Sequence, residues 1–235
     1  MRMRHLCGVV VAASLVLGAS PAPGDGSAVA AEVTVTLRDA PAVRVGPLAL
    51  ASTSGTTNAD IAGVNASGLV MAGMATSYAT RDEDTGDVHA QADVNDVDIR
   101  LPALTGTFGS VIATCEATQT GAKGVSMLGN GRIAGLLVGA NPAPNTTVDL
   151  AAAKVVFNEQ IQQADGSLTV NAVHIYLKAR IGAGHVVLAK ATCGLAAHPV
   201  PLATGPGLWL GLGLVALVAG ALLIRRQTRI TRIPR

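Results

Sequence analysis

The densest group of side chains that could do chemistry is the stretch Arg81–Asp87, which reads Arg-Asp-Glu-Asp-Thr-Gly-Asp. Asp82, Asp84 and Asp87 supply carboxylates around a glycine, and carboxylate oxygens are ligands that calcium prefers. A full calcium loop needs further acidic positions and a closing bidentate carboxylate, which the flanking residues do not supply. The stretch is therefore an incomplete metal candidate, with a solvated hairpin turn as the alternative, and no cofactor is predicted.

Four histidines could act as metal ligands or general bases: His89, His174, His185 and His198. None stands at metal-ligand spacing with another His or Cys. His174 is expected on the outer face of a strand, and His198 in a linker. The serines lack the strained turn that a Ser-His-Asp nucleophile needs, so no catalytic residue is predicted.

One carboxylate pair remains as a candidate for acid–base chemistry. Glu159 stands between Asn158 and Gln160 at the end of a predicted strand, and Asp165 follows shortly after it. Together they could donate and accept a proton, or both could simply line a turn.

The chain has three cysteines, of which Cys115 and Cys193 lie beyond the apolar N-terminal run. In an exported protein these two could form a disulfide. Closing so long a loop would stabilise the fold by roughly 4–5 kcal/mol in the chain-entropy model. Two buried free thiols are the alternative.

The elements that must position these residues alternate with period two, which is typical of strands. Turn-forming clusters separate them, such as Ser54-Gly55, Thr105-Gly106 and Asp165-Gly166. The pattern predicts an all-β, β-sandwich-like exterior domain. The alternating stretches are 32–37, 43–49, 69–78, 88–101, 110–115, 155–160, 168–177 and 186–192.

Two of these stretches match one another. Val94–Leu101 and Val170–Leu177 agree at five of eight positions, and each is followed by a strand that ends in Ala-Thr-Cys. Val, Ile and Leu share one parity in both stretches and should face the core, which leaves Asp98 and His174 on the wetter face. The domain is interpreted as two related β-units with one cysteine each, with chance similarity as the alternative.

The first thirty residues have the order of a secretory signal peptide. Basic residues come first, the apolar run Leu6–Gly18 follows, and small residues end at Ala28-Val29-Ala30. The run is too short to span a bilayer as a helix. Residues 1–30 are therefore predicted to be a signal peptide cut after Ala30, and residues 31–199 to be the exterior domain.

The C-terminal segment predicts a membrane anchor. Leu208–Ile224 is apolar throughout and would form a helix of about 26 Å, within the range that spans a bilayer. Trp209 suits the outer interface, and the arginines that begin with Arg225 and Arg226 should stay in the cytoplasm. The chain is thus expected in the cell membrane as a single-pass protein, with residues 31–199 outside and residues 225–235 inside.

The linker, residues 200–207, contains Pro201-Leu202-Ala203-Thr204-Gly205. A small-residue motif, an apolar segment and an arginine-rich tail form the layout of a bacterial cell-wall sorting signal, which is cut between Thr and Gly. Thr204 and Gly205 fit the usual Leu-Pro-x-Thr-Gly pattern, but Pro201 and Leu202 are reversed. Transfer to the cell wall and retention in the membrane both remain open.

Charge and composition limit the classes of partner that the exterior domain is expected to bind. The chain has 17 basic and 15 acidic residues, but seven of the basic residues and only Asp25 of the acidic ones lie in the two terminal segments. The exterior domain is therefore mildly acidic, with no basic stripe for nucleic acid. Aromatic residues make up 2% of the chain, so the core must be built from Val, Leu, Ile and Ala.

The stretches Asn141–Leu150, Val155–Gln160, Gly166–Ile175 and Val186–Cys193 together resemble the choice-of-anchor P family of exported proteins from high-GC Gram-positive bacteria. The resemblance covers roughly residues 35–195. It implies display at the cell surface and pairing of the two cysteines, and it supplies no catalytic residues. The expected role is structural or adhesive, through contact with cell-wall polymer or other surface proteins; a membrane-tethered hydrolase is the alternative.

Overall fold

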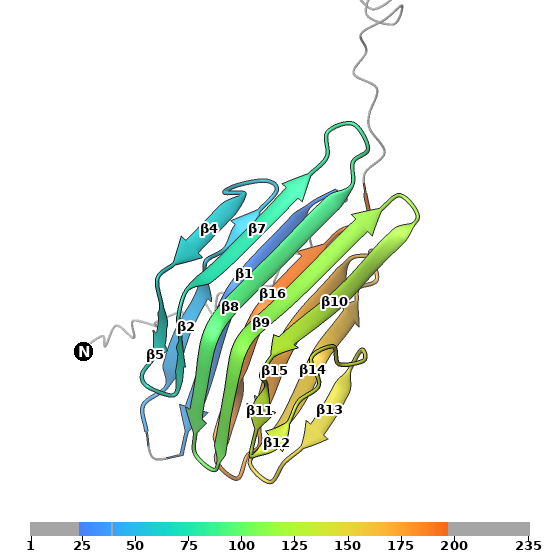
Figure 1. The fold of residues 1–235 in the computed structure, drawn as a ribbon. Helices are drawn as coiled ribbons and strands as arrows, with labels where there is room; N and C mark the ends of the chain where they lie inside the picture. Colours follow the sequence, from blue (N-terminus) through green and yellow to red (C-terminus); the bar gives the residue numbers. More distant parts are fainter. Residues whose placement is uncertain (1–23, 39, 197–235) are drawn as a thin grey trace, which may run out of the picture. The chain divides into compact units, whose positions relative to one another are not determined.

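The structure is a computed structural model that describes residues 24–38 and 40–196. All regular elements in these ranges are β-strands, and they form two antiparallel sheets (Figure 1). The prediction of an all-β domain is confirmed, because the alternation of apolar and polar residues continues along most of the strands.

The seven-stranded sheet, here sheet A, has the strand order β13-β14-β15-β16-β1-β2, with β3 beside β1. Its central strands come from opposite ends of the domain, since β1 pairs along its length with β16. The strands are β1 (Gly26–Leu37), β2 (Val43–Leu48), β3 (Ala51–Ser52), β13 (Thr146–Asp149), β14 (Ala153–Gln162), β15 (Leu168–Leu177) and β16 (Gly182–Cys193).

The nine-stranded sheet, here sheet B, is built around the long hairpin of β8 and β9. β7 and β6 lie beside β8, and β10 and β11 lie beside β9. The strands are β4 (Asn58–Ile61), β5 (Val64–Ala66), β6 (Val70–Ala72), β7 (Ala75–Arg81), β8 (Val88–Leu101), β9 (Leu104–Thr118), β10 (Gly121–Gly129), β11 (Arg132–Ile133) and β12 (Leu136–Leu137).

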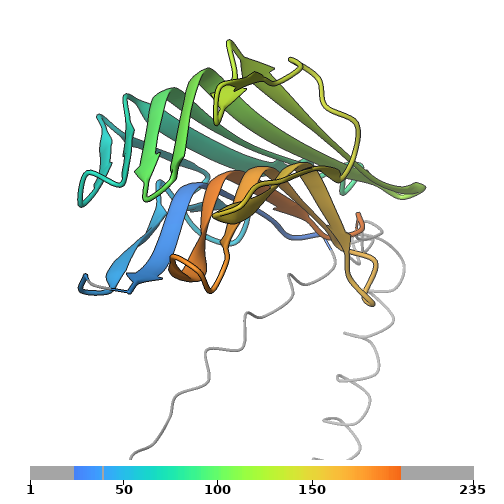
Figure 2. The same ribbon diagram turned by 90° about the horizontal axis from the view of Figure 1, so that it is seen from below.

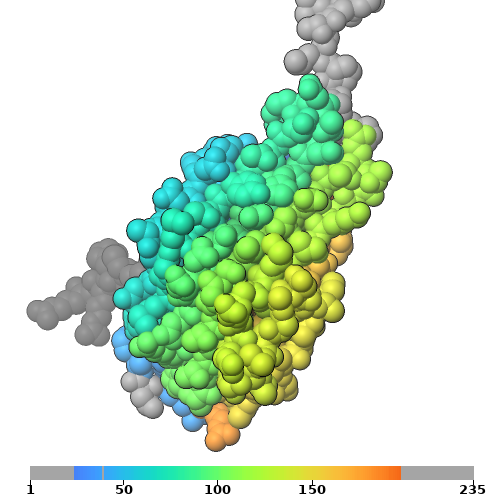
Figure 3. All heavy atoms as spheres, viewed as in Figure 1, coloured from blue at the N-terminus to red at the C-terminus, as the bar shows by residue number. Residues whose placement is uncertain are grey.

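The two sheets pack face to face as a sandwich-like pair of layers (Figure 2). The core between them is made mostly of Val, Ala, Ile and Leu, as the shortage of aromatic residues predicted. The two phenylalanines of the chain meet inside it, with the ring centroids of Phe108 and Phe157 6.3 Å apart. Each sheet therefore has one face in this core and one outer face; Figure 3 shows that of sheet B.

The two predicted cysteines meet in this core. Cys115 of β9 and Cys193 of β16 are fully buried, their Cα atoms are 5.8 Å apart, and their sulfur atoms lie at disulfide distance. Since β9 belongs to sheet B and β16 to sheet A, the pair links the two layers.

Several expected boundaries differ from the observed ones. The domain start expected at residue 31 falls inside β1, which begins at Gly26. Thr105-Gly106, expected in a turn, lies within β9, where a Cβ on Gly106 would come within 2.6 Å of Ile133 Cδ1. That glycine serves close packing rather than chain reversal. β10, which the alternation analysis did not predict, adds a strand beside β9.

Several predicted features lie outside the described residues. They are the first part of the signal peptide, His198, the linker with Thr204 and Gly205, and the apolar segment with Trp209, Arg225 and Arg226. Within residues 24–38 and 40–196, no helix has the length and apolar character needed to cross a bilayer.

Candidate functional site

A row of irregular positions crosses sheet A and decides which side chains reach its outer face. In four neighbouring strands the pairing skips one residue at the same level: Asn158 of β14, Ala172 of β15, Ala189 of β16 and Ala30 of β1. Asn158 and Ala189 have positive φ angles of 50° and 51°. The skipped residues of neighbouring strands lie opposite one another, so the pairing register is kept, but the alternation of side chains changes at this level.

The shift gathers polar side chains that simple alternation would separate. Ala172 and Val173 are consecutive, yet both are fully buried in the core. Asn171 and His174, three positions apart, consequently lie on the same outer face, and Tyr176 follows there. Across the row on β14, Glu159 is the register partner of Asn171.

Glu159 is the acceptor at the centre of this group. Its Oε2 accepts hydrogen bonds from Asn171 Nδ2 at 2.7 Å and from His174 Nδ1 at 2.6 Å. Its Oε1 accepts a hydrogen bond from the Tyr176 hydroxyl at 2.6 Å. We call these four residues the Glu159 cluster.

The electrostatics of the cluster follow from these bonds. Burial opposes ionisation of Glu159, but the hydrogen bonds from His174, Tyr176 and Asn171 outweigh it and lower its pKa to about 2. Burial, together with the bond to the anionic Glu159, raises the pKa of Tyr176. Glu159 is thus a fixed anion at neutral pH, and Tyr176 stays protonated.

Two buried atoms of the cluster, Asn171 Oδ1 and His174 Nε2, have no hydrogen-bond partner among residues 24–38 and 40–196. Because Nδ1 of His174 donates to the anion, Nε2 is the ring nitrogen that the cluster does not engage. His185 lies beside it, with ring centroids 5.4 Å apart. Burial, then the proximity of His174, lowers the pKa of His185.

Aromatic and cationic side chains extend the cluster along β14 and β15. The rings of His174 and Tyr176 are stacked with centroids 3.8 Å apart, and Lys154 Nζ lies 5.9 Å from the centre of the Tyr176 ring. Chemically, the group offers a fixed anion, a phenol hydroxyl, an imidazole and an amide on one sheet face. It can recognise hydroxyl or amide groups, and its Glu–His contact is also an element of acid–base sites.

The outer face of sheet B carries a second, more open group. Tyr78 is hydrogen-bonded to His89 Nε2 at 2.7 Å, and His89 Nδ1 lies 3.3 Å from Glu116. With Asp82 and Asp87, His89 and Glu116 line an open cavity of about 230 Å³. Both tyrosines of the chain therefore stack on a histidine, one on each sheet.

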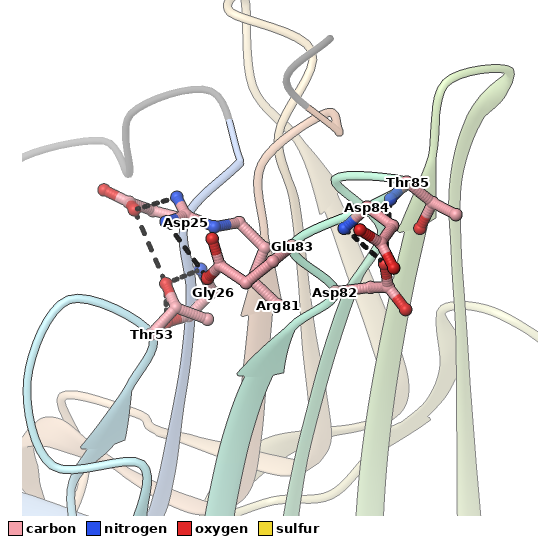
Figure 4. Close-up of polar contacts among 8 residues, drawn as sticks. All are labelled: Asp25, Gly26, Thr53, Arg81, Asp82, Glu83, Asp84 and Thr85. Atoms are coloured by element: carbon pink, nitrogen blue, oxygen red, sulfur yellow. Dashed lines mark hydrogen bonds and ion pairs between the residues drawn. The ribbon is translucent and has the colours of Figure 1, made fainter. Parts of the chain in front are cut away.

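The acidic loop follows β7 and forms a turn (Figure 4). Asp82 Oδ1 accepts hydrogen bonds from the backbone N–H groups of Asp84 and Thr85, at 2.9 and 2.8 Å. The bonds from Thr85 and then Asp84 lower the pKa of Asp82. In the described part of the chain, no three His, Cys, Asp or Glu residues are grouped to hold a metal.

Two members of the Glu159 cluster were candidates from the sequence: Glu159, which was paired with Asp165, and His174, which was given no partner. In the structure Glu159 contacts His174, and the carboxylate of Asp165 accepts hydrogen bonds from the Ser167 backbone and hydroxyl in the turn after β14. His174 is on the outer face as predicted, but it is only 8% exposed. Tyr176 was not predicted, although it is one of only two tyrosines and stands two positions from His174.

No protein-family model, curated protein or solved structure matches this chain. The resemblance to the choice-of-anchor P family therefore stays a prediction.

Proposed function

We propose that this chain is an exported, surface-held β-domain whose role is interaction, with the outer face of sheet A as its contact surface. The observation that carries the proposal is the Glu159 cluster: four polar side chains held in fixed positions on one sheet face by hydrogen bonds to one another. Side chains that are already held in place lose little conformational freedom when a partner binds, which favours binding at such a face.

The cysteine pair supports the exterior location. Cys115 and Cys193 lie at disulfide distance, and disulfides persist mainly in oxidising compartments outside the cytoplasm. We place the protein in the cell membrane through residues 208–224, or in the cell wall if the chain is cut between Thr204 and Gly205. This anchoring also fits the choice-of-anchor P resemblance.

A membrane-tethered hydrolase is the second candidate, and the contact between Glu159 and His174 favours it. A general base must reach the proton that it removes. Among the described residues, however, none of the hydrogen bonds of the cluster comes from a serine or cysteine nucleophile. We therefore rank interaction first.

We also infer that the β8–β9 and β15–β16 hairpins are related units. Their matching segments both have an irregular position at the third residue, Asp96 and Ala172. The cysteines are not equivalent in register, since Cys115 is opposite Ala90 and Cys193 is opposite Leu168.

A binding comparison of matched tyrosine variants tests the proposed contact surface. Purified full-length chain is incubated with insoluble cell-wall polymer and, separately, with solubilised surface proteins. Tyr176→Phe removes the hydroxyl bound to Glu159, and we expect it to weaken binding about 5–10-fold, which corresponds to about one hydrogen bond. Tyr78→Phe makes the same change on sheet B and should bind like the wild type.

Two outcomes would count against this assignment. Equal binding by Tyr176→Phe and the wild type would remove sheet A as the contact surface. Release of soluble fragments from the polymer, abolished by Glu159→Gln, would favour the hydrolase. Protease added to intact cells tests the location separately, because an exterior domain should be digested without lysis.

A further inference from the structure

The first part of β1, Gly26–Ala30, has the small residues that a signal-peptide end requires, but it is an integral part of sheet A. Gly26 is the register partner of Cys193, and Ala28 is the partner of Ala191. Ala28 is 1% exposed and Ala30 is fully buried. If the signal peptidase cut after Ala30, the mature protein would lose this part of a central strand.

Close packing gives these small residues a second explanation. A Cβ on Gly26 would come within 2.5 Å of Val88 Cγ1, a side chain of β8 in the opposite sheet. The alanines of β1 belong to the same core cluster, where larger side chains would overfill the space. The Ala-x-Ala pattern here therefore follows from the distance between the two layers.

The start of the strand is also tied down by polar contacts. The backbone N–H of Gly24 donates to Leu195 O at 2.7 Å, and that of Gly194 donates to Asp25 O at 2.8 Å. Gly26 and Thr53 are joined by three hydrogen bonds: Gly26 N donates to Thr53 Oγ1, and both the N–H and the hydroxyl of Thr53 donate to Gly26 O (Figure 4). The loop that contains Thr53 and the end of β16 thus both depend on residues 24–26.

We propose that the mature protein retains residues 24–30 and that the export peptidase cuts between Gly18 and Gly24. The proposal rests on the export assigned above. The reaction is hydrolysis of one peptide bond: the C–N bond breaks, the hydroxyl of water adds to the carbonyl carbon to give a carboxylate, and the nitrogen takes the proton to become the new N-terminal amine. Ala19, Ser20 and Ala22 provide small residues in this interval, directly after the apolar run.

A substitution within the disputed segment of the full chain tests the proposal. If residue 26 is retained, Gly26→Val must appear in the mass of the mature protein, and the clash with Val88 should lower its thermal unfolding midpoint by about 3–10 °C. Ser27→Thr is the matched control, because Ser27 is partly exposed and should change the mass without changing the midpoint. It also keeps the mass measurement informative if Gly26→Val fails to fold.

The position of the cut and the occurrence of export have distinguishable outcomes. A mature N-terminus between residues 19 and 24, read by mass spectrometry of protein recovered from the cell surface, supports the proposal. An N-terminus at Ala31, with both variants identical in mass to the wild type, overturns it and leaves export standing. A chain that keeps Met1 overturns both.

Discussion

At the scale of single residues, Glu159 shows how an anion is kept on a mostly buried sheet face. Its side chain is 12% exposed, and that of its partner His174 is 11% exposed. Desolvation alone would favour the neutral acid. The hydrogen bonds from three donors, however, stabilise the ionised carboxylate by more than desolvation costs. The same donors become partly unsatisfied if the carboxylate is neutralised, so the charge of Glu159 contributes to folding stability.

Replacing Glu159 by Gln should therefore lower stability in a pH-dependent way. The pKa of Glu159 falls from 4.5 to about 2 on folding, so its contribution is complete above about pH 4.5 and is lost as the pH falls towards 2. We expect Glu159→Gln to cost about 2 kcal/mol at pH 7. Its difference from the wild type should shrink below pH 4.5, as measured by denaturant unfolding at a series of pH values.

A matched change on the other sheet provides the control. Glu116 also lies beside a histidine, but its side chain is 61% exposed. Glu116→Gln should change the free energy of unfolding by less than about 0.5 kcal/mol. A cost for Glu159→Gln that stays constant from pH 7 to pH 2 would contradict the assigned role of the charge.

The residues of the cluster were only partly predictable from sequence. Glu159 and His174 attract notice by chemical type alone. Their contact depends on the irregular position at Ala172 and on those in the neighbouring strands. Beyond this level each side chain lies on the opposite face from the one that simple alternation predicts. An asparagine such as Asn158 tolerates positive φ, but a buried alanine such as Ala189 gives no such signal in the sequence.

At the scale of elements, apolar alternation predicted strands where one face is core and the other is polar. The bounds of β8 and β15 agree with the expected stretches 88–101 and 168–177. β10 was missed because glycines replace side chains at several of its positions. At Gly124 the opposite sheet leaves no room for a side chain, since a Cβ there would lie 2.2 Å from Val170 Cγ2.

Adding a methyl group to β10 should therefore separate the layers locally. Gly124→Ala is expected to reduce the free energy of unfolding by roughly 1–3 kcal/mol, because the added Cβ would overlap the buried side chain of Val170 in β15. Gly139→Ala is the control, since no atom lies within 4 Å of the Cβ that it would add. Equal stability of both variants, measured by thermal unfolding, would show that β10 and β15 are less closely packed than described.

At the scale of the whole molecule, a core of small aliphatic residues gains from a covalent link between its layers. Each Val or Ala buries less area than an aromatic residue would. Cys115 and Cys193 stand in the central strands of the two sheets, far apart in sequence. The sequence allowed this pairing, but it could not specify which strands the cysteines would join.

Removing the link should destabilise the domain. We expect the double substitution Cys115→Ser and Cys193→Ser to cost roughly 2–5 kcal/mol, measured by thermal unfolding under oxidising conditions. Under reducing conditions the wild type should unfold at a lower temperature than when oxidised, whereas the double variant should be unaffected. Titration of two free thiols at Cys115 and Cys193 in the oxidised, native protein would contradict the pairing.

The irregular row in sheet A has a consequence for how this domain can evolve. Four adjacent strands have their irregular position at the same level, so the pairing register is the same on both sides of it. Deleting one residue from a single strand would shift its pairing register by one position and turn its apolar side chains towards solvent. Insertions and deletions at Ala30, Asn158, Ala172 and Ala189 should thus be tolerated only when they occur together. The first strand of the domain and its last three strands must therefore change length together.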